Sequence, residues 1–220
     1  MCGNGCRGAA AFARHLVVMV KLPVAGRVKT RLARGIGVGR AVGFYRAGLR
    51  ATLARLGQER RWTISVAVSP DMGVYEPVWP VLCRRIAQGP GDLGLRMQRV
   101  MDRMPPGPVV IIGSDVPGIT PGHIARAFKM LDGADVVIGP APDGGYWLVG
   151  LRRRPRTVRL FDRVRWSHAE TLADTLANAS GLRVRWLEEF DDVDDARDFE
   201  RLGARGARRV PSPPNIFSRC

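Results

Sequence analysis

Short apolar runs alternate with segments of helical periodicity along most of the chain. The runs are five to eight residues long and fall at 15–20, 62–69, 83–87, 108–115, 134–140, 146–151 and 182–188. Helical spacing of apolar residues separates them, at 39–57, 91–104, 120–133 and 168–179, with a short helix beginning near Val28 and a last one from about Ala196. This alternation predicts an α/β fold with a mostly parallel sheet covered by helices on both faces.

The two ends of the chain lack this alternation. Residues 1–14 and 204–220 are rich in Gly, Pro, Ser and Arg, so we expect flexible tails around one domain at 15–203. No apolar run approaches the roughly 20 residues that span a bilayer. The first residues also lack the apolar core of a secretory signal. We therefore expect a cytoplasmic protein without a membrane span.

Composition narrows the classes of function. The formal net charge is +15, and the 35 basic residues include only three lysines. The arginines are spread along the whole chain without interleaved aromatics or a known nucleic-acid-binding signature, so we expect no specific nucleic-acid partner. The four cysteines lack the spacing of a zinc site or a disulfide framework and are expected to be reduced thiols.

In folds of this type, ligands bind beyond the carboxyl ends of the strands, where four loops carry candidate chemistry. The first loop, "KLPVAGRVKTR", gathers Lys21, Gly26, Lys29 and Arg31 before a short helix. Amide groups at a helix start and nearby cations suit phosphate binding, although the spacing is not that of a P-loop. The alternative is a turn with solvated cations. We expect Lys29 and Arg31 to be exposed in the empty protein and to contact phosphates.

Two further loops carry acids. Asp115 stands at the end of the run at 108–115, where a carboxylate either binds Mg²⁺ beside ligand phosphates or only caps a turn. The segment 188–200 holds eight of the 20 acidic residues. Within it, Asp192 and Asp194 alternate in an extended lead-in and can both face a divalent ion. The alternative is an acidic helix start, since Asp is favourable there.

The fourth loop, "PAPDGGYWLVG", places Asp143 before two glycines and a strand. An Asp-Gly pair between two strands is a common hairpin turn. By pattern alone, such a turn between Gly139 and Tyr146 accounts for the motif as well as a functional loop does.

Six segments that occur in order carry a family resemblance: "VKLPVAGRVKTRL", "QGPGDLGLRM", "VVIIGSDVPGIT", "DVVIGPAPDGGYWLVGL", "VRWSHAETL" and "DDVDDARDF". They resemble the glycosyltransferase-like radical-SAM/selenodomain-associated transferases over residues 16–202. That family is related to 2-phospho-lactate guanylyltransferase and, more distantly, to molybdenum-cofactor guanylyltransferase. The resemblance implies a single-domain GT-A-like, nucleotide-diphospho-sugar transferase fold, with a mixed sheet between helices and a nucleotide across the strand ends.

The resemblance also implies roles for the residues that match the family's motifs. Contacts to the nucleotide and its phosphates fall on Lys21, Gly26, Lys29, Arg31, Gly91, Asp92 and Gly94. Metal ligands fall on Asp115, Asp192 and Asp194, and contacts to the second substrate on Asp143, Gly144, Gly145 and Tyr146. The family has Trp-Ser-Thr where this chain has Trp166, Ser167 and His168. We leave His168 out of the chemistry.

The resemblance favours a metal-dependent transferase that moves a sugar from a nucleotide-diphospho-sugar to the hydroxyl of a small-molecule acceptor. In this hypothesis Mg²⁺ or Mn²⁺ on Asp115 neutralises the leaving diphosphate, and Asp143 serves as general base. The alternative is a guanylyltransferase-like nucleotidyltransferase, in which a phosphorylated acceptor attacks an NTP. A third hypothesis is an Arg-rich nucleic-acid-binding protein without catalysis, which has no need of paired aspartates at strand ends.

Overall fold

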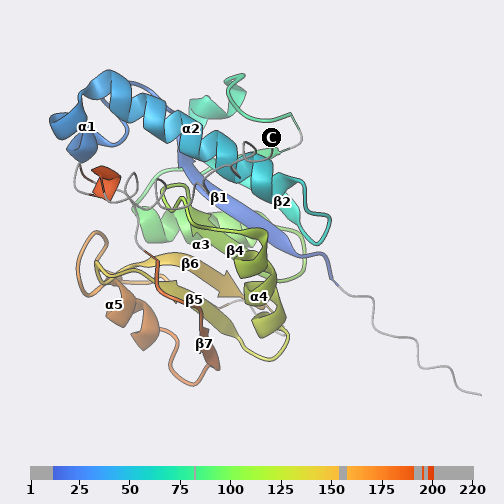
Figure 1. Cartoon of the computed structure of the whole chain (residues 1–220). Coiled ribbons are helices and arrows are strands. Elements are labelled where there is room, and N and C mark those ends of the chain that lie inside the picture. Colours follow the sequence, from blue (N-terminus) through green and yellow to red (C-terminus); the bar gives the residue numbers. More distant parts are fainter. Residues whose placement is uncertain (1–11, 82, 154–157, 191–194, 196–197, 201–220) are drawn as a thin grey trace, which may run out of the picture.

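A seven-stranded sheet forms the centre of the computed structural model, which describes residues 12–81, 83–153, 158–190, 195 and 198–200. The strand order is β3-β2-β1-β4-β6-β5-β7. The strands are β1 (His15–Lys21), β2 (Thr63–Ser69), β3 (Arg84–Ala87), β4 (Val109–Gly113), β5 (Val136–Pro140), β6 (Tyr146–Leu151) and β7 (Val184–Trp186). All pairings are parallel except those of β6, which is antiparallel to β4 and β5. Figure 1 shows this twisted sheet.

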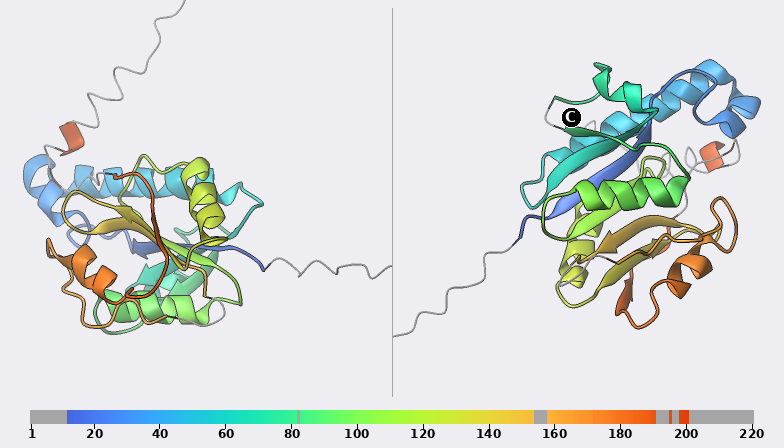
Figure 2. Two further views of the ribbon diagram at one scale, coloured as in Figure 1. Left: turned by 90° about the horizontal axis from the view of Figure 1, so that it is seen from below. Right: turned by 180° about the vertical axis from the view of Figure 1, so that it is seen from behind.

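Helices cover both faces of the sheet. They are α1 (Thr30–Ile36), α2 (Val38–Gly57), α3 (Leu93–Arg103), α4 (Pro121–Leu131) and α5 (Thr171–Ala177), with a short 3-10 helix at Asp71–Tyr75. Figure 2 shows α2 and α4 on one side of the sheet and α3 and α5 on the other. No helix among the described residues is long and apolar enough to cross a membrane.

The alternation of side chains along the strands builds one core on each face. On β1, Val18 points to a cluster that includes Leu53 of α2 and Phe128 of α4. Its neighbour Val17 points to the opposite cluster, which includes Met101 of α3. The central strands are therefore buried on both faces, which explains why they appear in the sequence as continuous apolar runs.

The predicted α/β class with a mostly parallel sheet and flanking helices is confirmed, and each predicted strand is present. The helix predicted at 168–179 is shorter, since it begins at Thr171 and ends at Ala177. The sequence did not predict the 3-10 helix at Asp71–Tyr75. The start of the closing helix at Ala196, most of the predicted N-terminal tail and the whole of the C-terminal tail lie outside the described residues.

The order of the strands determines where a ligand can enter. The chain runs from β1 to β2 and β3 in one direction, then returns to place β4 on the other side of β1. The connections that leave β1 and β4 therefore diverge at the carboxyl ends of these neighbouring strands, the usual position of a crevice in open α/β sheets. The loop that begins after Lys21 and the one that begins after Gly113 lie there.

Candidate functional site

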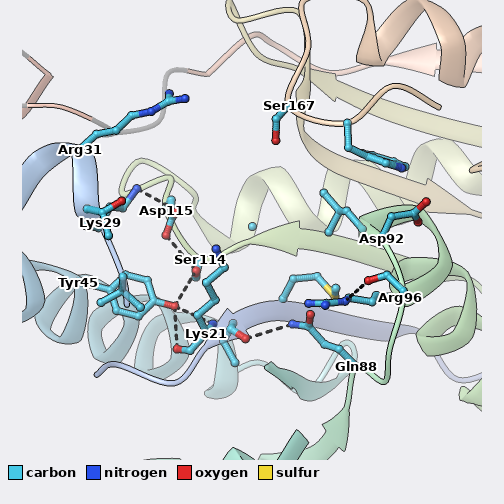
Figure 3. A pocket seen from close by; sticks show the side chains of 18 residues that line it. Lys21, Lys29, Arg31, Tyr45, Gln88, Asp92, Arg96, Ser114, Asp115 and Ser167 are labelled. Carbon is cyan, nitrogen blue, oxygen red and sulfur yellow. Dashed lines mark hydrogen bonds and ion pairs between the residues drawn. The ribbon is translucent and has the colours of Figure 1, made fainter. Parts of the chain in front are cut away.

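A cavity of about 580 Å³ lies at the carboxyl edge of the sheet (Figure 3). Its volume is within the range of small-molecule sites, roughly 300–1,000 Å³. It is lined by Met19, Val20, Lys21, Val28, Lys29, Thr30, Arg31, Tyr45, Gln88, Gly91, Asp92, Leu93, Arg96, Gly113, Ser114, Asp115, Trp166 and Ser167. Two of the four loops that the sequence singled out, those after β1 and β4, therefore meet in one cavity with the segment of Gly91 and Asp92.

Lys29 forms an ion pair with Asp115 across this cavity. The Lys29 Nζ lies 2.9 Å from Asp115 Oδ2, and the Lys29 side chain is only 4% exposed. The expectation that Lys29 is exposed in the empty protein is thus wrong. Lys29 occupies the N-cap position of α1 with a positive φ of 49°, and its side chain reaches back to the end of β4 rather than into solvent. A positive φ outside glycine is costly and often marks functional sites.

The other predicted residues of this loop lie differently. Arg31 is exposed, as expected, and it lines the cavity together with Lys21. Gly26 does not line the cavity. Its φ of 75° gives the loop a turn that a side chain would strain. The loop therefore brings three cations to the cavity, of which Lys29 is paired with a carboxylate.

A hydrogen-bonded network fixes the other oxygen of Asp115. Ser114 Oγ donates to Asp115 Oδ1 at 3.0 Å, and Tyr45 Oη lies 3.2 Å from Ser114 Oγ. Since the Ser114 hydrogen is donated to Asp115, the Tyr45 hydroxyl donates either to Ser114 or to the Lys21 carbonyl at 3.1 Å. It also accepts from the amide of Lys21 at 3.0 Å, which ties α2 to the end of β1. Burial raises the pKa of Tyr45, so its hydroxyl stays protonated as a hydrogen-bonding group.

Asp115 fits a divalent cation by its chemistry and position. Its side chain is 37% exposed toward the cavity, and it already holds a cationic group, the ammonium of Lys29. Carboxylate oxygens are the preferred ligands of Mg²⁺. The other two predicted ligands, Asp192 and Asp194, lie outside the described residues. Within the described part of the chain, no group of three acidic, His or Cys side chains could hold a metal.

The loop that precedes α3 forms a second side of the cavity. Gly91 and Asp92, both predicted to lie near the nucleotide, line it. The Asp92 carboxylate caps α3, since it accepts from the amide of Leu95 at 2.8 Å. Gly94 does not line the cavity but allows close packing, because a Cβ there would collide with the ring of Trp166.

Sequence reasoning missed two polar side chains on this side, Gln88 and Arg96. Gln88 donates both amide hydrogens to main-chain carbonyls, those of Val20 and Ala67, at 3.1 and 2.7 Å. Its carbonyl oxygen is then the group that remains for a ligand. Arg96 is held by the Gly91 carbonyl at 2.8 Å. The only available signal was their place in "QGPGDLGLRM", which does not reveal where the side chains point.

The residues predicted to contact the second substrate do not line the cavity. Asp143 Oδ1 accepts from the amide of Gly145 at 2.9 Å, within the hairpin turn that joins β5 to the antiparallel β6. Gly144 has a φ of 83°, and a Cβ there would collide with the carbonyl of Ala169. Tyr146 is half-buried, and the burial of its hydroxyl raises its pKa. The hairpin interpretation therefore accounts for this turn.

His168 has a capping role. Its Nδ1 accepts from the amide of Glu170 at 3.2 Å, just before α5, and it does not line the cavity. A threonine hydroxyl at this position can accept a local amide in the same manner. Histidine in place of the family's threonine therefore keeps this local hydrogen bond, and the neighbouring residues Trp166 and Ser167 line the cavity.

Comparisons with known proteins identify a family and a shared fold. The family described as "Uncharacterized protein conserved in bacteria (DUF2064)" matches residues 52–168, just over half of the chain. A protein from Desulfovibrio desulfuricans G20, provisionally named a nucleotide-diphospho-sugar transferase, has a similar structure. It is 28% identical with a TM-score of 0.81, over 90% of this chain and 89% of that chain. No curated protein matches the chain.

More distant structures share the fold alone. Rv0371c from Mycobacterium tuberculosis H37Rv, solved in complex with manganese, is 17% identical with a TM-score of 0.54, over 87% of this chain and 98% of that chain. The inositol-1-phosphate CTP transferase from T. maritima is 12% identical with a TM-score of 0.59, over 90% of this chain and 98% of that chain. The predicted nucleotide-diphospho-sugar transferase-like fold is confirmed.

Proposed function

This chain belongs to the DUF2064 family of bacterial proteins, and we propose that it is a transferase that uses a nucleotide-activated donor. The observation that carries this proposal is the convergence of Lys21, Lys29 and Arg31 with Asp115 in one cavity at the carboxyl ends of β1 and β4. Cations from a helix-start loop beside a carboxylate suit a diphosphate and its counter-ion. The likeness to a transferase at 28% identity supports the same class.

Each side of the cavity has a role in this proposal. Lys29 and Arg31 bind the donor's phosphates, and Lys21 lies beside them. Asp115 holds Mg²⁺ or Mn²⁺, with Asp192 or Asp194 as further ligands, and the ion would neutralise charge on the leaving diphosphate. The manganese in the Rv0371c structure supports a divalent cation. Gln88 offers its carbonyl oxygen to an N–H group of the donor's base.

We favour glycosyl transfer from a nucleotide-diphospho-sugar to a hydroxyl of a small acceptor. The structural relative with the 0.81 TM-score supports this class, as does the resemblance to the radical-SAM/selenodomain-associated transferases. The resemblance assigns the general base to Asp143. That carboxylate accepts a hydrogen bond within its own turn, so this role requires the acceptor to reach the β5–β6 hairpin.

One observation favours nucleotidyl transfer as a second candidate. Among the described residues that line the cavity, the carboxylates are Asp92, which caps α3, and Asp115, which pairs with Lys29. A hydroxyl acceptor would benefit from a free carboxylate base, whereas an attacking phosphate is already ionised and needs none. The fold shared with the CTP transferase supports the same candidate. The resemblance, which implies a relation to 2-phospho-lactate guanylyltransferase, favours it too.

Product analysis distinguishes the two reactions and tests the shared proposal. The purified protein would be incubated with Mn²⁺ and either nucleotide-sugars or NTPs, in a mixture of phosphorylated and unphosphorylated small acceptors. Release of a nucleoside diphosphate from a nucleotide-sugar supports glycosyl transfer, and release of pyrophosphate from an NTP supports nucleotidyl transfer. If neither is released above the level of an Asp115→Asn control, the protein is not a transferase of this type.

A further inference from the structure

A third side of the cavity is formed by Trp166 and Ser167, which no prediction from the sequence assigned to a substrate. Ser167 has a positive φ of 55°, a conformation that side chains rarely adopt. Figure 3 shows its hydroxyl pointing toward the cavity. Within the described part of the chain, this hydroxyl has no hydrogen-bond partner, so it remains available to a ligand.

The segment that carries Ser167 is held firmly in place. Arg165 binds the carboxylate of Asp174 in α5 through Nε and Nη2, at 2.8 and 2.7 Å. Thr171 Oγ1 donates to the Arg165 carbonyl at 2.6 Å. The amide of Leu172 donates to the Gly144 carbonyl at 2.9 Å, which joins the segment to the β5–β6 turn. These contacts keep the Ser167 backbone in its strained conformation before any ligand binds.

Trp166 fixes the same side of the cavity against α3. Its indole packs on Gly94, where a Cβ would collide with it, and contacts the rings of Phe161 and Tyr146 at centroid distances of 6.3 and 6.5 Å. The indole thus presents an apolar surface at a defined position. The turn at Asp143, Gly144 and Gly145 and the contact with Gly94 hold this surface in place. Packing therefore explains why glycine occurs in both segments.

The three sides of the cavity differ in chemistry. The loop after β1 carries cations for phosphates, and Gln88 and Arg96 offer fixed polar groups suited to a planar base. The third side has no cation, since the segment 166–171 contains no Lys or Arg. A hydroxyl beside an aromatic surface suits a neutral, polyhydroxylated group, which a serine can hydrogen-bond as donor or acceptor.

We propose that Trp166 and Ser167 form the subsite for the group beyond the donor's diphosphate, and that this group is a neutral sugar or sugar-like polyol. The Ser167 hydroxyl hydrogen-bonds a hydroxyl of that group, and Trp166 contacts its C–H surface. This inference rests on the proposed function, because it requires the nucleotide in the same cavity. It also applies to nucleotidyl transfer when the phosphorylated acceptor is a sugar phosphate, because the product is then a nucleotide-diphospho-sugar.

Calorimetric titration tests the subsite by comparing each nucleoside diphosphate with its sugar conjugate. The probes are UDP, GDP, CDP, ADP and dTDP, each compared with its glucose conjugate in the presence of Mn²⁺. Ser167→Ala should weaken the glucose conjugate about three- to tenfold, the effect of one lost hydrogen bond, and leave the nucleoside diphosphate within about twofold. Ser167→Gly removes the hydroxyl while relieving the positive φ, and it should show the same selective loss. Ser180→Ala, an exposed serine outside the cavity, is the matched control.

The outcomes separate this inference from the proposed function. If the wild-type protein binds a nucleoside diphosphate but Ser167→Ala and Ser167→Gly bind the glucose conjugate normally, the subsite assignment is overturned and the proposed function stands. An equal loss for both ligands also overturns the assignment, because the hydroxyl would then serve the nucleotide or the fold. If the wild-type protein binds none of the ten probes, the proposed function fails and the subsite fails with it.

Discussion

Lys29 and Asp115 join the two strands whose connections diverge at the carboxyl edge of the sheet, through an ion pair of 2.9 Å. The lysine enters from the loop after β1, and the aspartate stands just beyond β4. The carboxylate that the sequence predicts as a metal ligand is thus already held by a cation of the same protein. A metal ion that binds Asp115, as we propose, would therefore compete with the Lys29 ammonium for the same carboxylate.

This competition predicts that replacing Lys29 strengthens metal binding in the ligand-free protein. Lys29→Met should raise the affinity for Mn²⁺ about three- to fivefold, since the partly exposed pair that it removes is worth about 1 kcal/mol or less. Calorimetric titration with Mn²⁺ alone measures this. Lys21→Met is the matched control, because Lys21 lines the cavity and no ion pair joins it to Asp115. An unchanged or lower Mn²⁺ affinity in Lys29→Met would contradict the competition.

The ion pair also makes a prediction about stability. Asp115→Asn removes the negative charge 2.9 Å from the buried Lys29 ammonium, so the free energy of unfolding should fall by about 1–2 kcal/mol. This is less than the loss for a fully buried pair, because the Asp115 side chain is 37% exposed. Urea unfolding measures the change.

The double variant Lys29→Met/Asp115→Asn supplies the control for this stability prediction. It removes both charges, so it should recover most of the loss seen in Asp115→Asn. Additive losses in the double variant would show that the two side chains do not interact in solution.

The geometry of the β5–β6 turn predicts that substitutions of Asp143 and Gly144 affect the protein differently. Asp143→Asn keeps an oxygen that can accept from the Gly145 amide, so stability should change little. In nucleotidyl transfer, which needs no general base, transfer activity should also change little. Gly144→Ala should lower the free energy of unfolding by more than about 1 kcal/mol, because of its positive φ and the collision with Ala169. Thermal unfolding and an activity assay measure the two effects. A folded Asp143→Asn protein that has lost activity would instead assign the general base to Asp143.

His15 predicts how stability depends on pH. It is buried at the start of β1, and burial lowers its pKa from the ordinary value of about 6.5, with nearby Arg153 and Arg84 acting in the same direction. The unfolded chain therefore binds a proton at a higher pH than the folded one, so stability is full above about pH 6.5 and falls as the pH drops below it. Urea unfolding at about pH 7 and pH 5 measures this slope.

A His15→Gln variant isolates that contribution. Glutamine does not titrate, so the slope should decrease while the hydrogen bond toward Thr63 can still form. Some slope should remain, because the pKa of His123 is also lowered by burial. A slope as steep as that of the wild-type protein would show that His15 does not carry the effect.

Hydrophobic periodicity was enough to predict the α/β class and the edge where the cavity lies, whereas the mixed sheet of a nucleotide-diphospho-sugar transferase fold came from the family resemblance. Buried strands such as Val109–Gly113 appear in the sequence as continuous apolar runs, and ligand sites at their carboxyl ends follow from topology. That reasoning placed Lys21, Arg31 and Asp115 at the edge, and the structure brings all three to one cavity. Whether they bind a nucleotide stays a prediction.

The sequence could not reveal which side chains contact residues that lie far away along the chain. The burial of Lys29 depends on Asp115, a partner 86 positions along the chain, and no local pattern encodes that pairing. Gln88 is fixed by carbonyls of two other strands, and Ser167 by contacts with α5 and the β5–β6 turn. For Asp143, two interpretations fitted the same motif, and only the geometry of the turn distinguishes them.

The most direct test of the central claim, that this cavity binds the phosphates of a nucleotide, is calorimetric titration of nucleoside diphosphates with Mn²⁺ into wild-type, Arg31→Ala and Arg34→Ala proteins. Arg31 lines the cavity, whereas Arg34, in the last turn of the same helix, does not. Binding to the wild-type protein that weakens about tenfold or more in Arg31→Ala and is unchanged in Arg34→Ala is the predicted result, since a charged phosphate contact is worth roughly 1.5–3 kcal/mol. Absence of binding, or equal affinities in all three proteins, would contradict the account.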